Sequence, residues 1–276
     1  MAAADRLTAA MRQIDRYRKR RPLHETRVQA EAQNWLARLH ATRGSASHGL
    51  DADGYEAYLR MQLVKSLRAS SRFSFEKKAK VFLQKHVLSK HAAKARVGVT
   101  AGVAAAHVAA APGEAIVLAL GCRDALELIL LRQIFKTTHV TGLDIFSLDP
   151  DITIGDMHAM PFADGSFDAV VACHSLEHAF APERAIQECV RVLKSGGVLA
   201  IEVPVRDMSG TGPLPNAADT ADRWDFCNAR SLLGSVAAST TRGVTVFYSR
   251  DVPEPASRAK AQLVVQLTGR ARAAPS

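Results

Sequence analysis

The sequence predicts an α/β fold with a mostly parallel, seven-stranded sheet that follows an N-terminal helical extension. Three observations indicate this fold. Short apolar runs alternate with helical patterns from residue 115 to 204, which is typical of repeated βαβ units. One run, Phe167–Cys173, is almost wholly apolar, as expected for a strand covered on both faces. The first two runs end at Gly121 and Asp144, so residues suited to ligand binding would meet at one edge of the sheet.

Apolar spacing and turn residues divide this region into elements. Strands are expected at 115–120, 139–145, 152–155, 167–173, 198–204, 243–249 and 261–268. A helix capped by Asp124 follows the first strand. Another begins near Pro182, which suits a first helical turn, and is expected to stop at Gly196-Gly197. A third is expected over 225–238, after a loop at 207–221. Together these elements make a Rossmann-like domain over 112–270, with a flexible tail at 271–276.

Residues 1–111 are predicted to form a basic helical extension, with helical spacing at 1–43, 54–67 and 73–95. Residues 1–96 hold 21 Lys and Arg against 8 Asp and Glu, a net charge of +13, whereas the whole chain carries +9. This asymmetry indicates an anionic partner for the N-terminal part, such as nucleic acid or another polyanion. In an enzyme, the same helices could instead form a lid over the substrate. A solvated helix face is the plainer interpretation of the same charges.

Cysteine usage and hydropathy limit the class of protein. The four cysteines form no CxxC pair, so we expect buried, reduced thiols and no metal site. No apolar run approaches the roughly 18–20 residues of a membrane span. We therefore expect a cytoplasmic protein, with organellar targeting left open; the sequence says nothing of its oligomeric state.

Residues at the strand ends suggest a nucleoside site. Gly121 would let backbone approach a ligand closely, and Asp144 would accept hydrogen bonds from both hydroxyls of a ribose. Asp156 and Met157 follow the third strand, where a carboxylate can accept from an adenine amino group and a thioether can pack on the ring. Each residue alone could equally be a turn, cap or core residue.

The run GDMHAMPFADGSFDAVVACHSLEHAFAPERAIQECVRVLKSGGVLAIEVP resembles the central block of class I, S-adenosylmethionine (SAM)-dependent methyltransferases of the small-molecule type. The resemblance covers residues 115–204 closely and extends loosely to residue 268. It implies SAM as cofactor and methyl transfer to an oxygen or nitrogen atom of a small molecule. It also implies that His174 lines the methionine pocket. His178 is a candidate general base at neutral pH, and it could equally cap or pack the connection after the fourth strand. The cofactor-binding residues expected on this basis are Gly121, Arg123, Asp144, Ile145, Asp156, Met157 and His174.

The first glycine motif departs from that family. The family pattern DxGxGxG reads ALGCRDA here, so Ala119 replaces an acid and Arg123 replaces a glycine. Arg123 could bind the SAM carboxylate or obstruct the pocket. The alternative function is therefore a methyltransferase-like, non-catalytic or RNA-associated protein. The sequence HSLEH at 174–178 matches a zinc-peptidase pattern, but its place after a buried strand argues against a helical metal site.

Overall fold

The computed structural model describes residues 98–206 except 112, 123, 124, 146, 148 and 150, together with 228–254 and 258–269. It also describes residue 12 and residues 54–62 except 56 and 60. The expectations for the rest of the basic extension, for Arg123, Asp124 and Cys227, for the 207–221 loop and for the tail lie outside the described residues.

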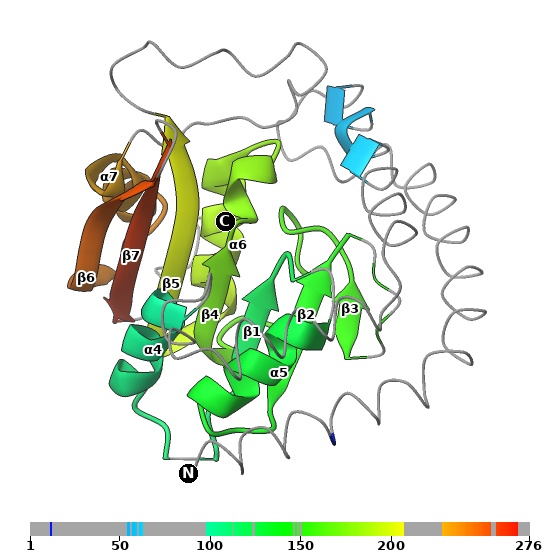
Figure 1. Cartoon of the computed structure of the whole chain (residues 1–276), viewed down its shortest axis with the longest axis vertical. Helices are drawn as coiled ribbons and strands as arrows, with labels where there is room; N and C mark the ends of the chain where they lie inside the picture. The colour runs from blue at the N-terminus through cyan, green and yellow to red at the C-terminus, as the bar shows by residue number, and fades with distance from the viewer. Residues whose placement is uncertain are drawn as a thin grey trace, which may run out of the picture.

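Within the described residues, seven strands form one sheet with the order β3-β2-β1-β4-β5-β7-β6 (Figure 1). The strands are β1 (Val117–Leu120), β2 (Val140–Asp144), β3 (Ile152–Ile154), β4 (Phe167–Cys173), β5 (Leu193–Arg206), β6 (Gly243–Glu254) and β7 (Arg258–Thr268). Strands β1 to β5 are parallel, and β7 runs antiparallel to both β5 and β6. The predicted mostly parallel, Rossmann-like sheet is confirmed.

Helices cover both faces of this sheet (Figure 1). They are α4 (Gly98–His107), α5 (Ala125–Ile134), the short 3₁₀ helix η3 (Leu176–His178), α6 (Pro182–Val192) and α7 (Ala229–Ala238). Alternate residues of β1 divide the core: Val117 and Ala119 pack with α4 and α5, whereas Leu118 and Leu120 pack with η3, α6 and α7. Among the described residues, no helix is long and apolar enough to cross a membrane.

Two predicted helix boundaries are wrong. Helix α6 ends at Val192, before Gly196-Gly197, because Leu193 is already extended and pairs with Phe167 of β4. Helix α7 begins at Ala229 rather than at residue 225, because Asn228 is extended. The Asn228 side chain accepts a hydrogen bond from the backbone N–H of Ser231 at 2.8 Å and so caps the helix.

Charged residues of the family-like motif have structural partners. Arg191 donates to both carboxylate oxygens of Glu188, to Asp164, and to the carbonyls of Met160 and Phe162, at 2.7–3.0 Å. These contacts tie α6 to the segment that precedes β4. Other members of the motif, Lys194 and Asp168, form an ion pair of 2.9 Å. These charged residues therefore hold α6 against the segment before β4, and β5 against β4.

Helix α4 lies inside the predicted 1–111 extension, yet it packs on the sheet. Its residues Ala101 and Ala104 are fully buried in the same core cluster as β1 and α5. The Thr100 hydroxyl also lies 3.6 Å from the Cys173 sulfur at the end of β4. Helix α4 is thus structurally part of the sheet domain.

Candidate functional site

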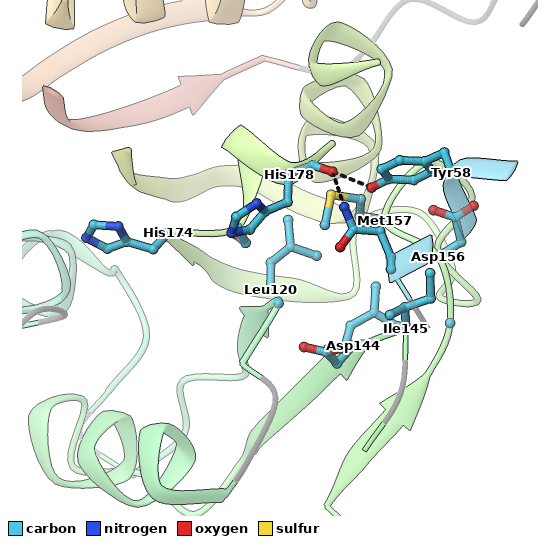
Figure 2. A pocket seen from close by; sticks show the side chains of 13 residues that line it. Tyr58, Leu120, Asp144, Ile145, Asp156, Met157, His174 and His178 are labelled. Atoms are coloured by element: carbon cyan, nitrogen blue, oxygen red, sulfur yellow. Dashed lines mark hydrogen bonds between the residues drawn. The ribbon is translucent and has the colours of Figure 1, made fainter. Parts of the chain in front are cut away.

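A pocket of about 570 Å³, including its open mouth, lies at the carboxyl ends of β1, β2, β3 and β4 (Figure 2). The structure brings together every predicted site residue that it describes: Gly121, Asp144, Ile145, Asp156, Met157, His174 and His178. Only Arg123, of the predicted set, lies outside the described residues. The sequence did not identify six further lining residues: Tyr58, Gln62, Leu120, Leu143, Gly155 and Ser175.

Gly121 follows β1 with a φ of +71°, a conformation that residues with a side chain rarely adopt. Its N–H donates to the carbonyl of Leu143 at 2.8 Å, which fixes the turn against β2. A Cβ atom added at Gly121 would lie 2.4 Å from the Cβ of Ser175. The glycine therefore lets β1 and the segment after β4 meet closely under the pocket.

Asp144 and Ile145 enter the pocket from the end of β2. Both are half-buried, so their side chains are available to the pocket while β2 holds their backbone. The carbonyl of Asp144 accepts a hydrogen bond from Gly155 at 3.0 Å, which joins this corner to the end of β3. Figure 2 shows the Asp144 carboxylate beside Ile145, below Asp156 and Met157.

Asp156 is held by neighbours from two parts of the chain. One carboxylate oxygen accepts from the backbone N–H of His158 at 2.9 Å and contacts its Nδ1 at 2.6 Å. The other accepts a hydrogen bond from the Tyr55 hydroxyl. Because Nε2 of His158 accepts from the N–H of Ala181 at 3.2 Å, the imidazole donates from Nδ1 to Asp156. Asp156 thus faces the pocket in a fixed orientation.

The helical residues at 54–62 lie at the rim of the pocket (Figure 2). Tyr58 donates to the carbonyl of His178 at 2.5 Å, and Gln62 donates to the same oxygen at 3.4 Å. The rings of Tyr55 and Tyr58 also pack on His158 and Phe180. The periodicity of the sequence predicted this helix. The sequence pattern does not show where the helix docks, because its partners Asp156 and His178 lie 101 and 120 residues further along the chain from Tyr55 and Tyr58.

His174 follows β4 with a φ of +54°, and its ring lies between two buried carboxylates, of which Glu202 is the closer. Its Nε2 lies 3.1 Å from Glu202 and its Nδ1 lies 3.5 Å from Glu177. Figure 2 shows this ring apart from the other labelled side chains. Burial alone would raise the pKa of Glu202. Hydrogen bonds from His174 and Gln262 and the charge of Lys260 outweigh burial, so the pKa of Glu202 lies below its ordinary value.

His178 closes the short helix η3, so the HSLEH sequence occupies a 3₁₀ turn rather than a long helix. Its side chain is 36% exposed, and its Nε2 lies 3.9 Å from Glu177. The described residues contain no group of three or more His, Cys, Asp or Glu side chains that could hold a metal ion. The His178 ring is thus partly exposed at the pocket, with the buried carboxylate of Glu177 nearby.

The sequence matches the family described as "Methyltransferase domain" over residues 118–201, which include strands β1 to β4 and most of the pocket. A curated relative, demethylmenaquinone methyltransferase of Thermotoga maritima, is 33% identical over 100 residues, which cover 33% of this chain and 43% of that protein. Ribosomal RNA-processing protein 8 of Mus musculus is 28% identical over 212 residues, covering 77% of this chain and 40% of that protein. The chain thus spans less than half the length of these relatives.

A solved structure has a similar fold. It is Burkholderia thailandensis 1,6-didemethyltoxoflavin-N1-methyltransferase with bound 1,6-didemethyltoxoflavin and S-adenosylhomocysteine. The TM-score is 0.54 at 19% identity, and the alignment covers 79% of this chain and 90% of that one. At this identity the similarity shows the fold.

Proposed function

Because the chain carries a class I, SAM-dependent methyltransferase domain, as its sequence predicted, we propose that the protein transfers a methyl group from SAM to an oxygen or nitrogen atom of a small molecule. One observation carries this proposal. Gly121, Asp144 and Asp156 follow three neighbouring strands, and all three line one pocket. This arrangement suits a nucleoside with a charged tail, in the crevice where open α/β sheets bind ligands.

The residues of the pocket fit SAM. Asp144 would accept from the ribose hydroxyls, with Ile145 beside it, and Asp156 and Met157 would contact the adenine. Because Gly121 has no Cβ to crowd Ser175, the methionine part of SAM can approach the backbone at this point. Ser175 lines the pocket, and its hydroxyl is buried without a hydrogen-bond partner among the described residues, as expected of an atom that can still accept a hydrogen bond from a ligand.

Bound SAM supplies an electrophilic methyl group on a sulfonium. The chain's own contribution is to align the acceptor with that methyl group and to exclude water. Tyr58 and Gln62 hold the carbonyl of His178, which fixes the position of this residue at the pocket. The His178 imidazole can then accept the proton that an acceptor hydroxyl or amine releases.

Two further observations concern the acceptor. The helical residues at 54–62 contribute Tyr58 and Gln62 to the pocket wall, so an acceptor would contact side chains from outside the sheet as well as from its strand ends. Several proteins to which the chain is similar bear the names of methyltransferases that act on small molecules, such as demethylmenaquinone. The identity of the acceptor would come from screening compounds against the full-length protein with labelled SAM.

Calorimetry with SAM and S-adenosylhomocysteine tests the proposal directly. Asp144→Ala should weaken the binding of both by roughly 100-fold or more, because two hydrogen bonds to a charged group are lost. Asp164→Ala is the matched control, since Asp164 is 80% exposed and contacts Arg191 away from the pocket. The proposal fails if the wild-type protein binds neither compound at millimolar concentration.

A second candidate function is RNA association through the basic N-terminal part. It is favoured by the net charge of +13 over residues 1–96 and by the similarity to mouse ribosomal RNA-processing protein 8, which spans 77% of the chain. In this case the full-length protein would bind RNA with an affinity that falls steeply as salt rises. Asp144→Ala would leave that affinity unchanged. RNA binding that persists without any SAM binding would favour a non-catalytic protein.

A further inference from the structure

Two polar side chains next to the pocket have atoms without hydrogen-bond partners among the described residues. They are Ser175 Oγ and Glu177 Oε2, and each residue is only 3% exposed. Ser175 lines the pocket directly against Gly121. Because buried polar atoms are nearly always paired in native proteins, each of these atoms needs a physical explanation.

Glu177 lies just behind the pocket wall. Its other carboxylate oxygen is 3.5 Å from Nδ1 of His174 and 3.9 Å from Nε2 of His178, and both histidines line the pocket. These separations are too long for strong hydrogen bonds. A buried carboxylate with such weak partners still has most of its capacity to accept hydrogen bonds from a cation.

Negative charge gathers around the end of β4. Burial raises the pKa of the Cys173 thiol well above its usual value, and the carboxylates of Glu127, Glu202 and Glu177 raise it further. Lys260, at 3.5 Å from Glu202, offsets one of these charges. Buried and partly buried charges are screened little by salt, so these carboxylates would favour a cationic group in the part of the pocket next to the end of β4.

The position expected to bear an acid offers no carboxylate. Ala119 is fully buried in the core between β1 and α5. We propose that Ser175 and Glu177, in place of a carboxylate at position 119, hold the ammonium group of the methionine part of SAM. This inference rests on the proposed function. An ammonium group has three N–H donors, and the serine hydroxyl and the glutamate carboxylate are matching acceptors.

The backbone of His174 supports this assignment. A non-glycine residue with a φ of +54° persists only where its surroundings hold it, and Glu202 does so through the ring. The strained residue directs the chain from β4 into the turn that carries Ser175 and Glu177. The acceptors are thus placed before any ligand arrives, which reduces the entropy that binding costs.

The test compares S-adenosylhomocysteine with its desamino analogue, which differs only in lacking the ammonium group. Titration calorimetry on the full-length protein should show that Glu177→Gln and Ser175→Ala each lower the affinity for S-adenosylhomocysteine. The loss should be about 10-fold or more for Glu177→Gln. Neither variant should change the affinity for the desamino analogue. Glu183→Gln and Ser195→Ala are matched controls, because both residues are exposed.

The outcomes separate this inference from the proposed function. If wild-type protein binds neither ligand, the proposed function fails. If wild-type protein binds but neither variant distinguishes the two ligands, the ammonium assignment is overturned while the methyltransferase proposal stands. Thermal unfolding checks that each variant is folded. If Glu177→Gln does not fold, the discrimination measured with Ser175→Ala decides the question alone.

Discussion

Replacing Gly121 by alanine should damage both the stability and the pocket of this protein. The residue has a φ of +71°, and the new Cβ would lie 2.4 Å from the Cβ of Ser175. The left-handed backbone costs an alanine about 1–2 kcal/mol. Overpacking adds on the order of 1–3 kcal/mol, because the connection after β4 must move. Gly121→Ala should therefore lower the free energy of unfolding by about 2–5 kcal/mol.

Gly165 supplies a matched control for the backbone contribution. Its φ is +64°, but the nearest atom to an added Cβ is the Cα of Lys194 at 3.9 Å, an ordinary contact. Gly165→Ala should therefore cost only the backbone part, about 1–2 kcal/mol. Urea unfolding of the full-length protein, followed by circular dichroism, measures both values.

A double-mutant cycle isolates the clash. Ser175→Gly removes the opposing Cβ, so it should recover part of the loss when it is combined with Gly121→Ala. The same clash should also weaken the binding of S-adenosylhomocysteine, because the alanine displaces a pocket-lining residue. The reasoning is refuted if Gly121→Ala is no more destabilising than Gly165→Ala, or if the cycle gives a coupling energy of zero.

Two further predictions concern charged groups. Arg191→Met should destabilise the protein by about 3 kcal/mol, because Glu188 is buried and loses its closest cation. Lys194→Met removes a more exposed ion pair and should cost about 1 kcal/mol or less. Equal losses of stability in urea unfolding would contradict this reasoning. Since its folded pKa is depressed, Glu202 stabilises the fold above its ordinary pKa of 4.5, and this contribution disappears as the pH falls through the lower folded value. In Glu202→Gln, the free energy of unfolding should therefore fall less steeply between pH 6 and 3 than in the wild type. An unchanged slope would contradict the depressed pKa of Glu202.

Local patterns were sufficient to predict the parallel half of the sheet. Strand β4 spans the predicted residues Phe167–Cys173, because it lies between β1 and β5 and its apolar side chains are buried on both faces of the sheet. The antiparallel strands β6 and β7 are longer than the sequence predicted. Strand β6 continues through Arg250 and Asp251 to Glu254, since pairing with β7 rather than hydrophobicity extends it.

Most of the predicted pocket residues share one property, which is that they lie at or just after the end of a strand. Because parallel strands end at the same edge, Gly121, Asp144 and Asp156 could be placed together from the sequence. Tyr58 and Gln62 could not, because their position depends on long-range docking of a helix. Ser175 was also missed, since a serine next to a histidine carries no distinctive pattern before the turn geometry is known.

The insertion of β7 between β5 and β6 has a consequence for synthesis on the ribosome. Until residues 258–268 have emerged, β5 has an open edge, which is prone to wrong pairing. Glu202 also lacks Gln262 and Lys260, both from β7, until then. A nascent chain that ends before β7 would therefore contain the strands that bear Gly121 and Asp144 but lack two partners of the carboxylate that holds His174. Assembly of the pocket during translation should therefore wait until residues 258–268 have emerged.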